Sequence, residues 1–450
     1  MSEWHSTLES MIGIAMSLGA EKADAVWFDT TDISLSCRGG VLEGLERSES
    51  RAITLRTFVG ERQAMVSSTD ISLKSLKNLA DSAVRMAKVA PPDALSRLAS
   101  EELYAKAPPA LDLCDPVEPA ADWLFAQAKE AEDAALSIPG ITNSEGADAG
   151  YSRSNIGLMI ASDGSIRFAR DYATSHASLS ASVLAGSGTG MQRDYDFTTA
   201  RHVSDLKAAK MIGENAAHRA IKRLHPRKAK SGTMPVLYDP RTSRQLLSAL
   251  ASAINGSSIV RGSSFLRGDM GKRIFAPGIT IIDDPLRKRG LASKPFDGEA
   301  VATKKLQVVE DGILASWILD TRSAGALDLA TTGHATRGLG SVPSPSSTNL
   351  YMEAGAASPE ALMKQMGNGL FITETFGTGI NTITGDYSQG VSGFLVEHGE
   401  IAAPVAEITI AGHLRDMFAR MIPADDLRFD YATNAPSLLI DGMAVAGSNA

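Results

Sequence analysis

Tight-turn dipeptides between strand-like runs restrict the fold of this sequence more than any other feature. Asp163-Gly164 separates two alternating runs in "NIGLMIASDGSIRFARD", and Asp311-Gly312 does the same in "KLQVVEDGILASWIL". Aspartate followed by glycine readily adopts the positive φ angles of a type I′ turn, which joins adjacent antiparallel strands. His398-Gly399 sits in a similar setting, although histidine adopts a positive φ less easily than glycine. We therefore expect antiparallel hairpins in the middle of the chain and near its end.

Periodicity divides the chain into three structured regions and a linker. Residues 1–90 combine an amphipathic helix, alternating strand-like runs and a second helix, which predicts an N-terminal α/β domain. Six prolines within residues 91–120 predict an extended linker. Two helices around strand pairs predict a central strand-and-helix domain over 121–228, and glycine-rich strand patterns predict a mainly β domain over 229–450. The predicted fold class is α+β, with N-terminal α/β sheet domains followed by a mainly β C-terminal domain.

Charge, hydropathy and cysteine content exclude several classes of protein. The chain has 44 Lys and Arg against 52 Asp and Glu, a net charge of -8, so we expect no nucleic-acid partner. It contains no apolar run long enough for a membrane span, so we expect no membrane contact. Cys37 and Cys114 form neither a disulfide framework nor a metal-binding pair. These features predict a soluble, cytoplasmic protein.

Common catalytic motifs are missing from the sequence. None of the eight histidines belongs to a His-Glu-x-x-His motif or has another histidine three to five residues away. Gly-x-Ser-x-Gly, the motif of a nucleophilic serine, does not occur. The string "GSGTG" at 186–190 joins two strand-like runs, which favours a hairpin turn over a phosphate-binding loop. The residues alone therefore predict no self-contained zinc site and no catalytic triad.

The segment 385–401, "GDYSQGVSGFLVEHGEI", concentrates residue types that also occur in metal and catalytic sites. Glu397 and His398 lie at the predicted hairpin tip, where alternating side chains point to opposite faces of the sheet and do not converge on one ion. We expect Asp386, Tyr387 and Ser388 in a glycine-bounded loop and keep them as candidate substrate contacts. The favoured interpretation of this segment is a scaffold.

A basic cluster follows the helix that closes the central region. Such cations complement the carbonyl end of a helix and stay solvated, so we expect a helix end and linker, with a docking patch as the alternative. The cluster consists of Arg219, Lys222, Arg223, Arg227, Lys228 and Lys230.

Three sequence blocks resemble a known family. They are "RKRGLASKPFDGE", "TTGHATRG" and the long block that begins "MGNGLFITETFGTGINTITGDYSQG". They are similar to the PmbA (TldE) branch of the TldD/PmbA metallopeptidases, and the resemblance extends over nearly the whole chain. It implies a barrel-like C-terminal domain. Within the last block, it assigns to the scaffold or the substrate chamber the residues Asp386, Tyr387, Glu397, Glu407 and His413.

The resemblance implies that the zinc site lies in another chain. In this family, the TldD-type subunit holds zinc through a His-Glu-x-x-x-His helix and a later cysteine. The corresponding helix here is "RQLLSALASAINGSS", in which Ser248, Ala249 and Ala253 occupy the motif positions. Serine and alanine replace neither imidazole ligands nor a carboxylate base. We therefore expect no catalytic, metal or cofactor-binding residue in this chain, and zinc in the partner subunit.

The implied function is that of a non-catalytic subunit in a heterodimer with a TldD-type chain. The pair would degrade or process unfolded peptides in an enclosed chamber. The alternative is a homodimeric peptide-binding or regulatory protein without a protease partner. A third hypothesis, an independent hydrolase, would use Ser388 as its nucleophile.

Overall fold

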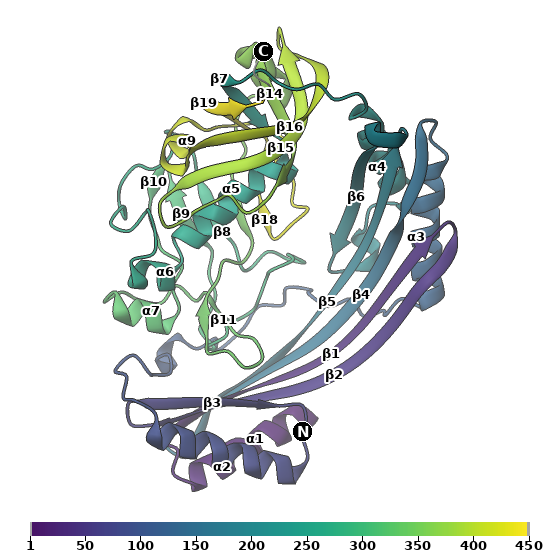
Figure 1. The fold of residues 1–450 in the computed structure, drawn as a ribbon. Helices are drawn as coiled ribbons and strands as arrows, with labels where there is room; N and C mark the ends of the chain where they lie inside the picture. The colour runs from purple at the N-terminus through teal and green to yellow at the C-terminus, as the bar shows by residue number, and fades with distance from the viewer. Residues whose placement is uncertain (1, 448–450) are drawn as a thin grey trace.

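A long antiparallel sheet forms the N-terminal half of the chain in the computed structural model, which describes residues 2–447. The sheet curves around one side of the C-terminal domain (Figure 1). Its strands follow the order β3-β2-β1-β4-β5-β6. The strands are β1 (Lys22–Arg38), β2 (Val41–Val59), β3 (Arg62–Ser68), β4 (Ile141–Ser162), β5 (Ser165–Ala185) and β6 (Gln192–Ala200).

The hairpin between β4 and β5 confirms the predicted Asp-Gly turn. Ser162 pairs with Ser165, and the two residues between them have φ angles of 51° and 72°. The predicted turns at Asp311-Gly312 and His398-Gly399 also join paired antiparallel strands, with φ angles of 45° and 55° at their first residues. Positive φ at two successive positions matches the twist of the flanking strands. "GSGTG" likewise lies between β5 and β6, as predicted for a hairpin turn.

Two helix pairs cover the convex face of the sheet (Figure 1). Odd-numbered residues of β1 carry their side chains toward these helices, because side chains alternate along a strand. Trp27 packs in one cluster with α1 (Glu3–Ser17) and α2 (Leu73–Val89). Leu35 packs in a second cluster with α3 (Ala121–Leu136) and α4 (Ala209–Lys222). The opposite face of the sheet is thus free to meet the C-terminal domain, where the even-numbered Val26 packs with Phe296.

Strands from both sides of the proline-rich segment share one sheet. β1 pairs with β4 from Lys22 to Cys37, so residues before 91 and after 120 form a continuous structure. Between them, the chain contains the short 3₁₀ helix η1 (Glu101–Leu103) and runs along the C-terminal domain, where the Ala105 nitrogen donates to the Ala300 oxygen at 2.9 Å. The division into domains at 1–90, 91–120, 121–228 and 229–450 stays a prediction.

The C-terminal domain contains a closed five-stranded barrel, which confirms the predicted mainly β, barrel-like fold. Its strands follow the order β16-β15-β14-β7-β19, and pairing between β16 and β19 closes the ring. A closed barrel leaves no unpaired strand edge. The barrel strands are β7 (Gly232–Tyr238), β14 (Gly369–Phe376), β15 (Asp386–Glu397), β16 (Glu400–His413) and β19 (Leu438–Ala446).

Shorter elements surround the barrel. A second sheet has the order β10-β9-β8-β13-β18, a two-stranded sheet pairs β11 with β12, and β17 pairs with β19. These strands are β8 (Ile281–Asp283), β9 (Leu306–Glu310), β10 (Ile313–Leu314), β11 (Ala335–Thr336), β12 (Ser344–Pro345), β13 (Leu350–Met352), β17 (Ile422–Pro423) and β18 (Thr433–Asn434). The helices are α5 (Pro240–Ala253), α6 (Gly256–Arg261), α7 (Thr321–Ala326), α8 (Pro359–Met366) and α9 (Leu414–Arg420); 3₁₀ turns η2 (Gly188–Gly190) and η3 (Val203–Asp205) lie in the N-terminal half.

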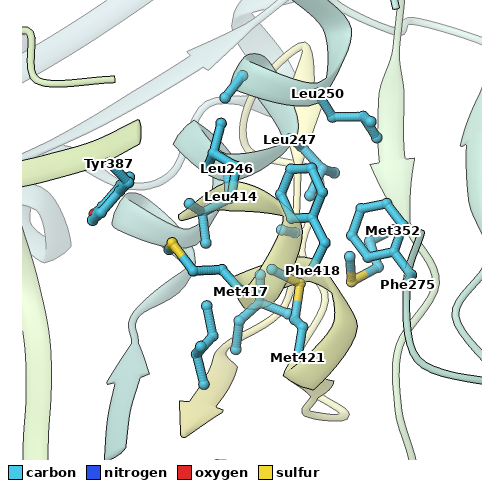
Figure 2. Packing of buried hydrophobic residues seen from close by; sticks show 14 of the residues in the cluster. Leu246, Leu247, Leu250, Phe275, Met352, Tyr387, Leu414, Met417, Phe418 and Met421 are labelled. Carbon is cyan, nitrogen blue, oxygen red and sulfur yellow. The ribbon is translucent and has the colours of Figure 1, made fainter. Parts of the chain in front are cut away.

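The largest hydrophobic core lies between the barrel, α5 and α9. Leucines of α5 contact the apolar side chains of α9 and of the neighbouring strands (Figure 2). The rings of Phe275 and Phe418 stack with their centroids 4.5 Å apart. This packing fixes α5 in one orientation. Among residues 2–447, no helix is both long and apolar enough to span a membrane.

Candidate functional site

A groove runs along β6, between the curved sheet and the C-terminal domain. β6 is the last strand of the sheet and pairs with β5, and it lies on the side of the sheet nearest the barrel (Figure 1). Two cavities of about 570 and 510 Å³ occupy the groove and share lining residues such as Arg219, Arg241 and Phe371. β6, α4 and the barrel supply the walls, so the groove combines residues far apart in the sequence.

The free edge of β6 presents main-chain groups to this groove. The Tyr195 nitrogen donates to Asp194 Oδ1 at 2.8 Å, and its carbonyl accepts from Arg219 Nη1 at 3.3 Å. These bonds to side chains show that the main chain of Tyr195 points away from β5. Because main-chain groups alternate along a strand, those of Phe197 and Thr199 point the same way. The groups of Tyr195 are already bonded, so an additional strand could pair with this edge at Phe197 and Thr199.

Ion pairs line the larger cavity and correct the prediction of a solvated basic cluster for Arg219 and Arg223. The other members are exposed, as predicted: Lys222, Arg227, Lys228 and Lys230. Arg223 is 8% exposed, lies 3.2 Å from Asp194 Oδ2 and also pairs with Glu374 of β14. The sequence could not reveal this partner, because Glu374 is distant along the chain. Arg219 pairs with Asp196 at 2.7 Å. These two arginines connect α4 with β6 and the barrel, and they are not a free helix end.

Arg241 extends the same network at the start of α5. Its guanidinium lies 3.2 Å from Asp194 and 4.3 Å from the centre of the Tyr195 ring. Burial opposes its charge, but Asp194, Tyr195 and Asp239 together more than compensate and raise the pKa of Arg241. Asp239 caps α5 by accepting from the Arg241 nitrogen, and burial raises the pKa of this carboxyl group. The groove thus contains a dense set of charges that are largely paired.

The positions predicted to match the zinc motif lie on α5 but do not form a common site. Ser248 is exposed, and its hydroxyl donates to the Arg244 carbonyl at 3.2 Å. Ala249 and Ala253 are 5% and 0% exposed and belong to the apolar core. Side chains of these types and directions do not fit a zinc ion. Among residues 2–447, no group of three or more His, Cys, Asp or Glu side chains could hold a metal ion.

The structure separates most of the predicted scaffold and chamber residues. Asp386 and His413 are paired across β15 and β16, whereas Glu397 lies at the opposite end of β15. His413 caps α9 by accepting from the Arg415 nitrogen, and its Nε2 lies 3.0 Å from the Thr384 oxygen. Glu407 is exposed and lies 3.4 Å from Lys228. Apart from the buried Tyr387, which follows Asp386 in β15, only Asp386 and His413 are neighbours, so these residues do not form one catalytic centre.

The predicted loop at Asp386–Ser388 is wrong, because these residues begin strand β15. Asp386 accepts from the Thr384 hydroxyl at 2.6 Å, and Ser388 is exposed. Tyr387 is 2% exposed inside the barrel core, where burial raises its pKa to about 12. Its ring is therefore a packing element, and of the three side chains only Asp386 and Ser388 are accessible.

A second charged cluster, missed in the sequence, joins the sheet to the C-terminal domain. Asp24 of β1 accepts from Arg56 Nε of β2 at 2.9 Å and also pairs with Arg337, which lies in "TTGHATRG". Burial raises the pKa of the nearby Asp297 to about 6 and that of Glu299 to about 7. Asp24 is a charged residue within the buried run "ADAVWFD", and this could have indicated a buried ion pair. Its partners Arg56 and Arg337 could not be inferred from their spacing in the sequence.

Comparison with known proteins gives a consistent family. The chain matches three PmbA/TldA metallopeptidase models: domain 1 over residues 23–87, the central domain over 114–224 and the C-terminal domain over 231–447. It is 36% identical over 445 residues to "Metalloprotease PmbA" of Escherichia coli O157:H7, covering 98% of this chain and 96% of the relative.

Two solved structures share the fold across the whole chain. A crystal structure from Bacteroides thetaiotaomicron, described as a putative modulator of DNA gyrase, has a TM-score of 0.89 and 24% identity and covers 100% of both chains. TldE from Thermococcus kodakarensis has a TM-score of 0.87 and 19% identity, covering 98% of this chain and 100% of its own. Together, the sequence matches show that this chain belongs to the PmbA branch of the PmbA/TldD metallopeptidase family.

Proposed function

We propose that this chain is the non-catalytic subunit of a zinc peptidase complex and that its partner is a TldD-type chain of the same family. The observation that carries this proposal is the character of α5, where the expected motif positions hold an exposed serine and two core alanines. These residues supply no ligand to zinc and no general base. We assign the metal and the bond-breaking chemistry to the partner, and no step of that chemistry to residues of this chain.

The substrate class in this proposal is an unfolded peptide. The open edge of β6 supports it, because an extended chain can add to a free strand edge through main-chain hydrogen bonds. From Phe197 to Arg201, β6 and the residue after it offer roughly 13 Å of edge at about 3.3 Å per residue. A segment of about four extended residues would fit this length. A folded protein could not present such a segment without local unfolding.

The contribution of this subunit would be to bind and orient the peptide. Main-chain pairing selects an extended conformation and tolerates many side chains. The apolar walls, which include Phe371 and Phe394, would remove apolar side chains of the peptide from water. We place the complex in the cytoplasm.

The proposal is tested by measuring zinc content and cleavage of an unfolded casein for this chain alone, for the TldD-type sister and for their mixture. We expect this chain alone to be inert and metal-free and the mixture to cleave. A mixture with a sister whose zinc-binding histidines are replaced is the matched control and should be inactive. Stoichiometric zinc in this chain, or cleavage by it alone, would contradict the proposal and make Glu397, His398 and His413 the first residues to mutate.

The same experiment addresses the homodimeric alternative. Co-elution of the two subunits from a sizing column, together with cleavage by the mixture, supports a heterodimer. A chain that stays homodimeric and adds nothing to the activity of the sister would favour a peptide-binding protein without a protease partner.

A further inference from the structure

A third cavity continues the groove beyond the end of β6 and is rich in cations. Its volume is about 180 Å³, and it shares Lys207, Asp430 and Tyr431 with the neighbouring 510 Å³ cavity. Five cationic and two carboxylate side chains line it. We call it the end pocket. Its cations are Arg201, Lys207, Arg287, Lys288 and Arg289, the last three from the block "RKRGLASKPFDGE".

Three of these cations already have carboxylate partners. Lys207 lies 2.9 Å from Asp430, and Arg289 lies 2.6 Å from Asp112. Lys288 is 75% exposed and lies 4.0 Å from Asp112 at its closest approach. Solvated or paired groups like these have little to gain from a further anion.

The other two cations have no carboxylate partner among residues 2–447. Arg201 is 9% exposed and donates to the main-chain oxygens of Gly290 and Ser175, at 3.2 and 3.1 Å, and to that of Leu291. Burial lowers the pKa of Arg201, as expected where no nearby carboxylate offsets the desolvation of a cation. A buried charge of this kind is costly until an anion joins it.

Arg287 provides donors that face no protein acceptor. Its guanidinium lies 3.5 Å from the centre of the Phe429 ring. Within residues 2–447 this guanidinium donates no hydrogen bond and forms no ion pair, and only the main-chain oxygen of Arg287 is bonded. Stacking on an aromatic face fixes the plane of a guanidinium and leaves its N–H groups available at the edge. A planar carboxylate is a suitable ligand for such an edge.

We propose that the end pocket binds a carboxylate group of the peptide that lies in the groove, with Arg287 as the main donor and Arg201 as the buried counter-charge. The proposal rests on the proposed function, because the groove supplies the peptide. The carboxylate is either the C-terminal group of the peptide or an Asp or Glu side chain near that end. In both cases, the pocket would set the register of the peptide along β6.

The test measures binding of labelled peptides to the full-length chain by fluorescence anisotropy. The first probe is a ten-residue unstructured peptide with a free C-terminal carboxylate and no acidic side chain. The second is its C-terminal amide, and the third is the amide with glutamate as its last residue. We expect the free acid to bind at least about tenfold more tightly than the amide, as for a charge-assisted hydrogen bond.

The third probe distinguishes the two sources of carboxylate. Recovery of tight binding by the glutamate peptide means that a side-chain carboxylate suffices, whereas weak binding assigns the pocket to a chain terminus. Equal affinity for the free acid and the amide on the unmodified protein would refute the proposal without any variant, and so would the absence of binding by all three peptides.

A variant pair locates the effect in the pocket. Arg287→Gln should abolish the preference for the acid, and Arg287→Lys should restore part of it, since the charge remains. Arg85→Gln is the control, because Arg85 lies on α2 with its side chain 76% exposed. If Arg287→Gln keeps the preference, the pocket is not the anchor. Cleavage of casein by the mixed subunits is measured in a separate assay. If the mixture cleaves but the chain shows no preference for the free acid, the proposal that the end pocket binds a carboxylate is refuted. If the mixture does not cleave, the proposed function is refuted.

Discussion

Replacing Glu299 with glutamine should abolish much of the decrease in the free energy of unfolding that the protein shows between pH 5 and pH 8. Glu299 is 4% exposed, and its Oε2 accepts from the Thr321 nitrogen at 2.8 Å. Burial raises its pKa, and repulsion from Asp297 adds to the increase. Glutamine keeps the acceptor oxygen and the side-chain volume but carries no charge at any pH, so the substitution isolates the cost of ionisation.

The magnitude follows from the pKa in the two states. Folding raises the pKa of Glu299 from 4.5 to about 7. Below pH 4.5, the folded and unfolded states both hold the proton. Between 4.5 and 7, the unfolded chain releases it while the folded protein retains it, so the free energy of unfolding falls as the pH rises. At about 1.4 kcal/mol per pKa unit, the full loss above pH 7 is about 3 kcal/mol.

Urea unfolding at pH 5 and pH 8 would measure this loss. We expect the free energy of unfolding to fall by about 2 to 3 kcal/mol more in the unmodified protein than in Glu299→Gln. Glu310→Gln is the control, because Glu310 is exposed at the end of β9. Its pH dependence should equal that of the unmodified protein. An unchanged pH dependence in Glu299→Gln would refute the assignment of a raised pKa to this carboxyl group.

Three further substitutions test packing, the groove and the hypothesis of a serine nucleophile. Gly213→Ala should destabilise the protein by roughly 3 kcal/mol in urea unfolding, because the added Cβ would lie 1.9 Å from a main-chain oxygen of α3. The control is Gly13→Ala, which has open space around the added Cβ and should stabilise the protein by up to about 1 kcal/mol. Arg223→Gln should cost about 3 kcal/mol by the same assay, since it leaves Glu374 without its partner and Asp194 with Arg241 alone. A cost no larger than that of the neighbouring Lys222→Gln would argue against a buried pair. Ser388→Ala should leave casein cleavage by the reconstituted complex unchanged, and total loss of activity would revive the idea of a serine nucleophile.

Features set by a few adjacent residues could be predicted from the sequence. The turns at Asp163-Gly164 and His398-Gly399 depend on the φ preferences of two residues and on the alternation around them. The amphipathic helix at the N-terminus follows from apolar spacing, and its Leu8 and Met11 are fully buried. These signals depend only on neighbouring residues, so they can be interpreted without knowledge of the tertiary structure.

Features set by distant partners could not be predicted in the same way. Arg223 belongs to a run of basic residues that is typical of a solvated helix end, yet its partner Glu374 comes from a barrel strand. Asp386 follows a glycine, which favours a loop, but pairing with His413 in β16 extends the strand. The groove itself depends on the position of β6 relative to the barrel. Sequence periodicity indicates that β6 is a strand, but it does not indicate which of its edges stays open.

The arrangement of charges along the groove favours tolerance of different peptide sequences. Arg219, Arg223 and Arg241 are each paired with an aspartate of β6, so a peptide side chain would have to break an existing ion pair to bind them. For the largely buried Arg223 and Arg241, breaking the pair costs several kcal/mol, and one new contact does not recover that cost. Charge recognition should therefore be weak in the middle of the groove, where the main-chain edge of β6 does most of the binding. It should be strong where cations lack partners, near Arg201 and Arg287, so a substrate would be selected by an extended backbone and one carboxylate rather than by a sequence motif.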